Sequence, residues 1–230
     1  MEKITPIAGL LTCFVLYTVI IIAALPYEGQ QGEAYSIFNH FISELGSMRF
    51  STNHAIYNGG LMLASVGFGL FTFGLKDYFS TKSAQIGVRI GVLSSILSLC
   101  VGLVPEDYRI PHLLLAVSFF SMMALAAGII SWNIWVEERR PFPKWVAMHG
   151  FLIPITFVLF MSMPKHLMEV KRAQGAAFDR PEIWWLPFLE WIIFVLLTSW
   201  IFIVSIQMFQ MYRKQTLLDQ PALNDTHGAY

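Results

Sequence analysis

The sequence predicts an all-α integral membrane protein, a bundle of six membrane-spanning helices. Two observations lead to this prediction. The 230-residue chain is 56% hydrophobic and only 13% charged, whereas soluble domains carry about 25% charged residues. Six apolar runs are also long enough to cross a hydrocarbon layer of about 30 Å, which takes roughly 20 residues of helix. Because the formal net charge is zero, nothing in the composition suggests a nucleic-acid partner.

The six runs define one membrane domain and a short tail. They comprise residues 7–25, 56–75, 86–104, 113–136, 145–163 and 183–211. We therefore expect a six-span domain over residues 1–212 and a flexible tail over residues 213–230. The first run exceeds the apolar core of a signal peptide, about 7–15 residues, so we interpret it as an uncleaved anchor.

The distribution of basic residues indicates the orientation in the cell membrane. An even number of spans places both termini on one side, which carries eight lysines and arginines against six on the other. The compact group of Arg139, Arg140 and Lys144 in a short loop favours a cytoplasmic location for both termini. The loops after the first, third and fifth spans then share the extracytoplasmic face.

The third span carries small residues along one side of the helix. Small side chains let helix backbones approach closely, so we expect this span to be the central helix, with the fourth span as its partner. Pro154 in the fifth span predicts a kink, because proline removes a helical hydrogen bond. The small residues of the third span are Gly87, Gly91, Ser94, Ser95, Ser98 and Gly102.

A short amphipathic helix is expected in the first outer loop, over residues 38–47. Its apolar residues fall on one side, while His40, Ser43, Glu44 and Ser47 fall on the other. His40 and Glu44 are four residues apart, which on a helix makes them neighbours with Cβ atoms about 5–6 Å apart. Such a pair can share a proton, hold a metal or form a hydrogen bond.

Further ionisable residues converge on the same face. The segment from Pro105 to His112 opens the fourth span, and His54 and His166 lie in the other outer loops. Glu190 lies about 10 Å inside the sixth span, where a carboxylate requires a partner or a function. We predict a polar pocket with catalytic candidates His40, Glu44, Asp107 and His112, and with ligand-binding candidates Ser43, Asn58, Glu106 and Glu190.

Three chemical roles suit these residues. A histidine and a carboxylate can act as general base and acid on an ester or phosphoester of a lipid headgroup. The residue types also match zinc or iron ligands, but no closely spaced metal motif is present, and we assign no metal ligand. The same side chains could instead cap helices and fix loops.

Two motifs carry a resemblance to a known family. Phe-Ile-Ser-Glu-Leu-Gly at residues 41–46 follows the first span, and Gly-Leu-Val-Pro-Glu-Asp at residues 102–107 precedes His112. Their order and placement resemble the prokaryotic six-span membrane family catalogued as domain of unknown function 998, over about residues 7–211. The resemblance implies the architecture and draws attention to Ser43, Glu44, Asp107 and His112, without a settled activity. The family is similar in outline to GPI-anchor remodelling and autophagy-modulator proteins, an analogy of fold alone.

Three functions follow as alternatives. We favour a multi-pass membrane protein that binds a lipid or small ligand in the polar pocket, or transports it. The first alternative is a lipid-directed hydrolase or transferase that uses His/carboxylate or metal chemistry, and the second is a structural membrane component without a ligand. Membrane lipids are the expected partners. The sequence identifies no cofactor and no protein partner, and it leaves a homo-oligomer open.

Overall fold

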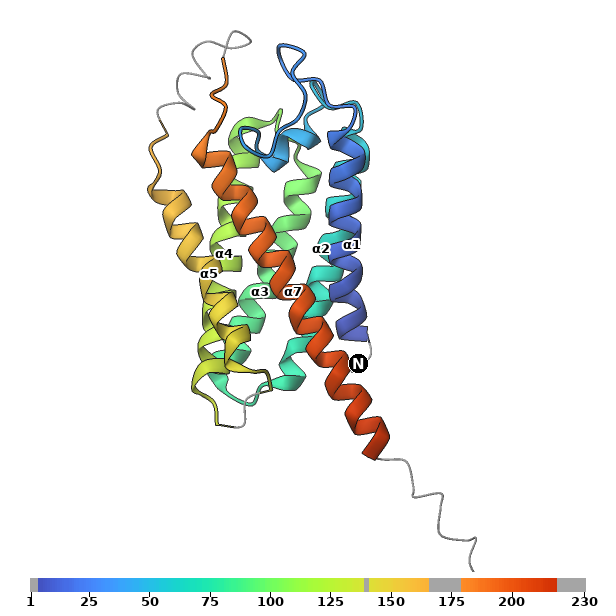
Figure 1. Ribbon diagram of the computed structural model, residues 1–230, viewed down its shortest axis with the longest axis vertical. Coiled ribbons are helices and arrows are strands. Elements are labelled where there is room, and N and C mark those ends of the chain that lie inside the picture. Colours follow the sequence, from blue (N-terminus) through green and yellow to red (C-terminus); the bar gives the residue numbers. More distant parts are fainter. Residues whose placement is uncertain (1–3, 139–140, 166–178, 219–230) are drawn as a thin grey trace, which may run out of the picture.

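The computed structural model describes residues 4–138, 141–165 and 179–218, with side chains up to residue 214. Arg139, Arg140, His166 and the end of the tail lie outside this part of the chain. The described chain is helical, and six helices are long and apolar enough to cross a membrane, which confirms the predicted fold class (Figure 1). These helices are α1 (Ile4–Ala24), α2 (His54–Gly74), α3 (Lys82–Leu103), α4 (Arg109–Val136), α5 (Lys144–Ser162) and α7 (Trp185–Leu218), and they overlap the six expected spans.

The six helices form a closed ring in which neighbours along the chain pack together. α1 contacts α2, and the contacts continue in order to α5 and α7, after which α7 returns to α1. The expectation that α3 is central was therefore wrong, because α3 packs between α2 and α4 like any other member. All of its predicted small residues are nevertheless buried. Gly91 faces Thr72 of α2 and Gly87 faces Ile129 of α4, so this surface serves two neighbours.

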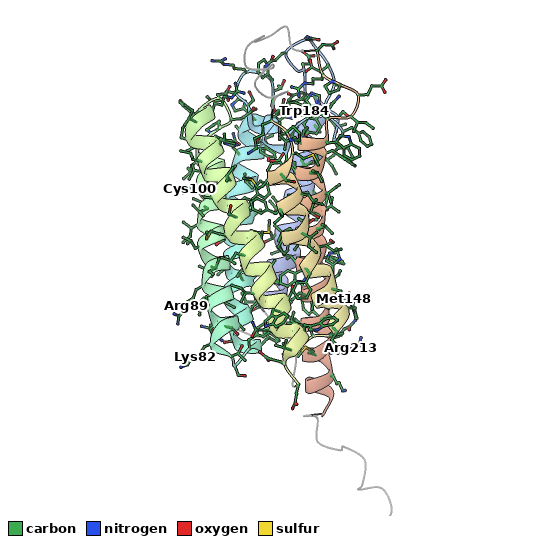
Figure 2. All side chains as sticks on the ribbon, turned by 90° about the vertical axis from the view of Figure 1, so that its left-hand side faces the viewer. Lys82, Arg89, Cys100, Met148, Trp184 and Arg213 are labelled. Carbon is green, nitrogen blue, oxygen red and sulfur yellow. The ribbon has the colours of Figure 1, made fainter. Side chains whose placement is uncertain are left out.

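The two ends of the bundle differ. One end, called here the cap end, carries the loop of residues 25–53, the short connection of residues 104–108 and the segment of residues 179–184 (Figure 1). The other, the terminus end, holds the start of α1 and the last turns of α7. Figure 2 shows Trp184 at the cap end, whereas Lys82, Arg89 and Arg213 lie toward the terminus end. Arg89 is exposed, as expected for a side chain that reaches for the headgroup layer.

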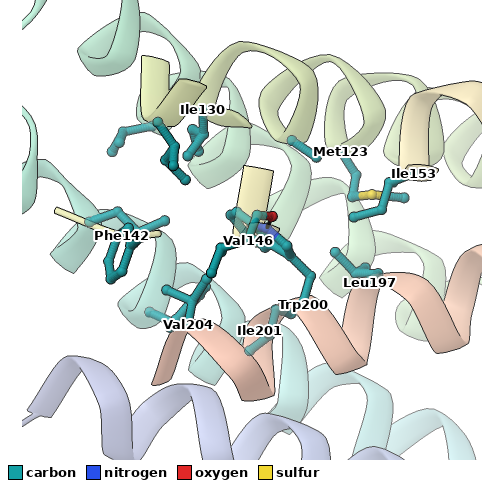
Figure 3. Close-up of a cluster of buried hydrophobic side chains, with 14 of the residues drawn as sticks. Met123, Ile130, Phe142, Val146, Ile153, Leu197, Trp200, Ile201 and Val204 are labelled. Atoms are coloured by element: carbon teal, nitrogen blue, oxygen red, sulfur yellow. Dashed lines mark hydrogen bonds between the residues drawn. The ribbon is translucent and has the colours of Figure 1, made fainter. Parts of the chain in front are cut away.

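The main apolar core lies where α4, α5 and α7 meet. Met123, Val146, Ile153 and Trp200 are almost fully buried there (Figure 3). The indole of Trp200 donates a hydrogen bond to the carbonyl of Val146, at 3.2 Å. Burial of such side chains supplies roughly 1.5–3 kcal/mol each relative to an aqueous environment, although within a bilayer close packing matters more than burial.

The short helix of the first outer loop is shorter than expected. It is the five-residue 3₁₀ helix η1 (Ile42–Gly46), and residues 37–39 form a turn before it. The Glu44 carboxylate accepts a hydrogen bond from the backbone N–H of Phe41, at 3.1 Å, so the helix is capped at Phe41 and starts after it. His40 therefore lies outside the helix, and its expected helical spacing from Glu44 is lost.

Candidate functional site

Arg180 is the centre of a buried network at the cap end. Its guanidinium donates to both carboxylate oxygens of Glu44, at 3.1 and 2.5 Å. It also donates to the carboxylate of Glu33, at 3.1 Å, and to the backbone carbonyl of Asn39, at 2.9 Å. The Arg180 and Glu44 side chains are only 8% and 3% exposed. Bidentate pairing of this kind fixes orientation as well as charge, so Arg180 clamps the segment before α7 onto the first loop.

Glu44 is fully engaged in this network. Besides Arg180 and the Phe41 backbone, the Tyr27 hydroxyl donates to it, at 3.3 Å. Burial, followed by the negative charge of Glu44, raises the pKa of Tyr27 well above its ordinary value. Burial opposes the charge of Arg180, but the hydrogen bonds and the charge of Glu44 outweigh it and raise the pKa of Arg180. The pair is therefore a fixed ion pair near neutral pH.

His40 lies beside the same network, in contact with different partners from those expected. Its Nδ1 is 2.7 Å from Oδ1 of Asn39, and its Nε2 is 3.6 Å from Oε1 of Glu33. The ring packs against Tyr27 and Tyr35, with centroids 5.4 and 5.1 Å away. Burial and the charge of Arg180 lower the pKa of His40, more than the nearby carboxylates raise it. The imidazole is therefore neutral at pH 7.

Asp107 joins the first loop to the connection between α3 and α4. Its carboxylate accepts from the backbone N–H of Met48, at 2.7 Å, and from the Ser47 hydroxyl, at 3.2 Å. Arg49 lies 3.8 Å away but is 77% exposed, so it adds little. Asn58 of α2 ties down the end of η1 by donating to the carbonyl of Gly46, at 2.9 Å. The two loops predicted to meet therefore do meet, through Asp107.

A cavity of about 90 Å³ lies beneath the cap, inside the ring. Side chains from η1 and from α1, α2, α3, α4 and α7 line it, and most of the lining is apolar. The polar side chains Ser43, Tyr57, His112 and Glu190 gather at its cap end. Its other end, deeper in the bundle, is lined by Thr12, Phe68, Leu197, Thr198 and Ile201.

Two ionisable groups of this cavity have few partners. Glu190 is 8% exposed, and its Oε2 accepts the backbone N–H of Ile42, at 2.9 Å. Among the described residues, no lysine, arginine or histidine lies within ion-pair distance of it. His112 is 7% exposed, and its Nδ1 contacts the carbonyl of Val104, at 2.6 Å. Its Nε2 is buried and has no hydrogen-bond partner in residues 4–138, 141–165 and 179–214. Buried polar atoms rarely lack a hydrogen-bond partner.

The structure thus divides the predicted site residues into two groups. Ser43, His112 and Glu190 line the cavity, and Glu106 is half-buried nearby, where its charge acts on Tyr27. The others hold the cap together: His40, Glu44, Asn58 and Asp107. The catalytic role of His40, Glu44, Asp107 and His112 stays a prediction. Among the described residues, no group of three or more His, Cys, Asp or Glu side chains could hold a metal ion.

Sequence reasoning missed Arg180, Glu33 and Tyr57. In the sequence Arg180 is one loop charge among several, and nothing near it indicates that it will be buried. Its contact with Glu44 spans 136 residues, so no local spacing could reveal the pair. Tyr57 lies in an apolar run of α2, where a tyrosine is an ordinary interfacial residue.

The ring and its interior define a class, a multi-pass membrane protein with an amphipathic cavity beneath a closed cap. The comparison with known families is more specific. The chain belongs to the family described as "Protein of unknown function (DUF998)", which matches residues 10–207. No curated protein and no solved structure matches the chain.

Proposed function

We propose that this protein binds an amphipathic ligand, a lipid or a smaller molecule, in the cavity beneath the cap. The observation that carries the proposal is the buried Nε2 of His112, a residue that lines the cavity; within the described part of the chain this nitrogen has no hydrogen-bond partner. A buried polar atom without a partner costs about 1–3 kcal/mol. A polar group of a ligand would remove this cost, while the apolar lining would hold its chain.

The cap contacts support the same proposal. Ile42 and Ser43 of η1 form part of the lining, and Ile42 donates to Glu190 through its backbone. Arg180 and Asp107 fix this helix from two sides, through Glu44 and through Met48. A rigid cover over a polar cavity mouth is the arrangement that a selective binding site needs, because preorganised groups lose little freedom when a ligand binds.

We infer that the cap faces the outside of the cell membrane and that both termini are cytoplasmic, as the basic residues favour. The polar end of the cavity then lies at the depth of the outer headgroups. Cysteines introduced at Gln31 and at Ser80, both exposed and at opposite ends of the bundle, test this orientation. A membrane-impermeant thiol reagent on intact cells should label Gln31→Cys and leave Ser80→Cys unlabelled; the reverse pattern contradicts the orientation.

A cavity-filling variant tests the binding function. Ala116 lines the cavity one turn below His112, so Ala116→Phe should occupy the space of the ligand. Native mass spectrometry of the protein purified in mild detergent should show a bound lipid or small amphipath that is lost in this variant. The matched control is Ala55→Phe, because Ala55 is exposed at the start of α2. Equal ligand content in all three proteins, or no ligand after incubation with membrane lipids, contradicts the proposal.

A second candidate, lipid-directed acid/base catalysis, draws on the same histidine. An imidazole with a free nitrogen, in a cavity that a carboxylate also lines, has the parts of a general base. Under this candidate, protein in nanodiscs should convert a labelled phospholipid, and His112→Ala should abolish the turnover. Turnover that survives His112→Ala contradicts it.

A further inference from the structure

We propose that the ligand is a hydrogen-bond donor with a positive charge, a primary alkyl ammonium whose chain lies along the apolar part of the cavity. This inference rests on the proposed function and names the chemical class of its ligand. It follows from the hydrogen-bonding character of the two polar groups that the fold holds in place, His112 and Glu190.

The tautomer of His112 is fixed by the backbone. Its Nδ1 lies 2.6 Å from the carbonyl oxygen of Val104, and a carbonyl oxygen can only accept a hydrogen bond. Nδ1 must therefore carry the proton in the neutral imidazole, which leaves a lone pair on Nε2. That nitrogen is buried, has no partner among the described side chains and backbone groups, and belongs to a residue that lines the cavity. Toward the ligand, His112 is an acceptor.

Glu190 is also an acceptor. The N–H of Ile42 donates a hydrogen bond to its Oε2, at 2.9 Å. That carboxylate oxygen therefore acts as an acceptor. Among the residues that the structure describes, the cavity lining contains no lysine and no arginine. Arg180, the buried cation of the cap, already forms ion pairs with Glu44 and Glu33.

The remaining polar side chains can adapt to either partner. Ser43 and Tyr57 carry hydroxyl groups, which donate or accept as needed. His112 and Glu190 thus each present an acceptor atom, and Glu190 becomes negatively charged when a cation beside it favours the ionised form. An ammonium group has three donors and supplies that cation, whereas a carboxylate or phosphate would disfavour the ionised form of Glu190.

The shape of the cavity indicates the rest of the ligand. On α7 its lining runs from Glu190 to Ile201, a rise of about 16 Å at 1.5 Å per residue. His112 and Glu190 lie at the cap end, whereas the deeper hydroxyls of Thr12 and Thr198 already donate to backbone carbonyls of their own helices, so the apolar part of the ligand points into the bundle. This length suits an octyl chain, but its volume exceeds the cavity of about 90 Å³, so lining side chains must move apart when the ligand binds.

Three probes with the same chain and different polar ends test the proposal: octylamine, octanol and octanoate. Their binding to the purified full-length protein in detergent can be measured by titration calorimetry at pH 7. The Ala116→Phe variant reports the background of partition into detergent. We expect octylamine to bind at least tenfold more tightly than octanol, and octanoate to bind most weakly. Glu190→Gln should weaken octylamine at least tenfold and leave octanol unchanged. Glu182→Gln, an exposed carboxylate near the cap, should change neither.

The outcomes separate the two proposals. If octanoate binds as tightly as octylamine, or if Glu190→Gln leaves octylamine binding intact, the cationic class is wrong while a ligand-binding cavity stands. If no probe binds above the background of Ala116→Phe, the proposed function itself fails. Should Glu190→Gln not fold, the relative affinities of the three probes for the unmodified protein test the cationic class.

Discussion

Two buried carboxylates in this protein have similar exposure and opposite surroundings. Glu44, in the cap, is paired with the guanidinium of Arg180 and bonded by Tyr27 and a backbone N–H. Glu190, below it in the cavity, is bonded by one backbone N–H. Ionisable groups inside a membrane protein are costly and need compensation. Where the fold supplies the compensation the residue stabilises the structure, and where it does not the residue is free to meet a ligand.

The largest loss of stability is expected when Arg180 is replaced, and a small loss would contradict this comparison. Arg180→Met leaves Glu44 and Glu33 without their cation, and loss of one partner of a buried ion pair costs about 3–5 kcal/mol. Thermal and denaturant unfolding in the same detergent measure the loss. In a double-mutant cycle with Glu44→Gln, the two effects should be strongly non-additive. A loss below about 1 kcal/mol, typical of a surface pair, would show that the cap does not depend on this clamp.

The second effect concerns the brace between the outer loops. Asp107→Ala removes the acceptor of Ser47 and Met48, and hydrogen bonds to a charged group contribute about 1.5–3 kcal/mol. We expect a loss of stability of about 2–3 kcal/mol in denaturant unfolding. Arg49→Ala is the control, because Arg49 is largely exposed and surface pairs contribute roughly 0–1 kcal/mol. Equal losses in the two variants would contradict the role of the brace.

The third effect is a pH dependence of the cap. The pKa of His40 is lowered by burial and by Arg180, so the unfolded chain, with a histidine pKa of about 6.5, binds the proton more readily. The stability that neutral His40 provides is complete above about pH 6.5 and is lost as the pH falls through its lower folded-state value.

Glu33 adds a second decline at lower pH. Burial acts to raise the pKa of Glu33, but backbone N–H donors and Arg180 lower it overall, so its contribution is lost below about pH 4.3. In a pH series of unfolding temperatures, His40→Phe should flatten the first decline and keep the second. Parallel profiles for the two proteins would show that His40 does not titrate as its surroundings require.

The smallest loss of stability is expected when Glu190 is replaced. This substitution tests most directly whether Glu190 differs from Glu44. Glu190→Gln keeps an oxygen that can accept from Ile42 and loses no ion pair among the described residues. Its stability without ligand should therefore stay within about 1 kcal/mol of the original protein, in the same unfolding measurement as Arg180→Met. A loss as large as that of Arg180→Met would indicate that Glu190 is a structural residue like Glu44.

The helices could be predicted from the sequence because their length and apolar content are local properties. The same holds for Glu190, whose depth follows from its distance from the start of a span, and for His112 at the mouth of α4. Helical spacing failed at two places in the cap, one decided by a local backbone cap and one by a distant contact. The Glu44 cap at Phe41 makes the short helix begin after His40, and the contact between Arg180 and Glu44 joins residues 136 positions apart. Such pairs leave no periodic pattern in a single sequence.

The contact between α1 and α7 has a consequence for biogenesis. Of the six spans, α1 leaves the ribosome before the other five and α7 after them, so the ring stays incomplete until α7 has been made. Thr198 of α7 accepts or donates a hydrogen bond with Tyr17 of α1, at 2.9 Å, and its carbonyl contacts the thiol of Cys13, at 3.3 Å. Glu190 is carried on the same late helix, and it reaches Ile42 in a loop made much earlier. A nascent chain that still lacks α7 therefore has no finished interior, and α7 supplies both the closing wall and the acidic group.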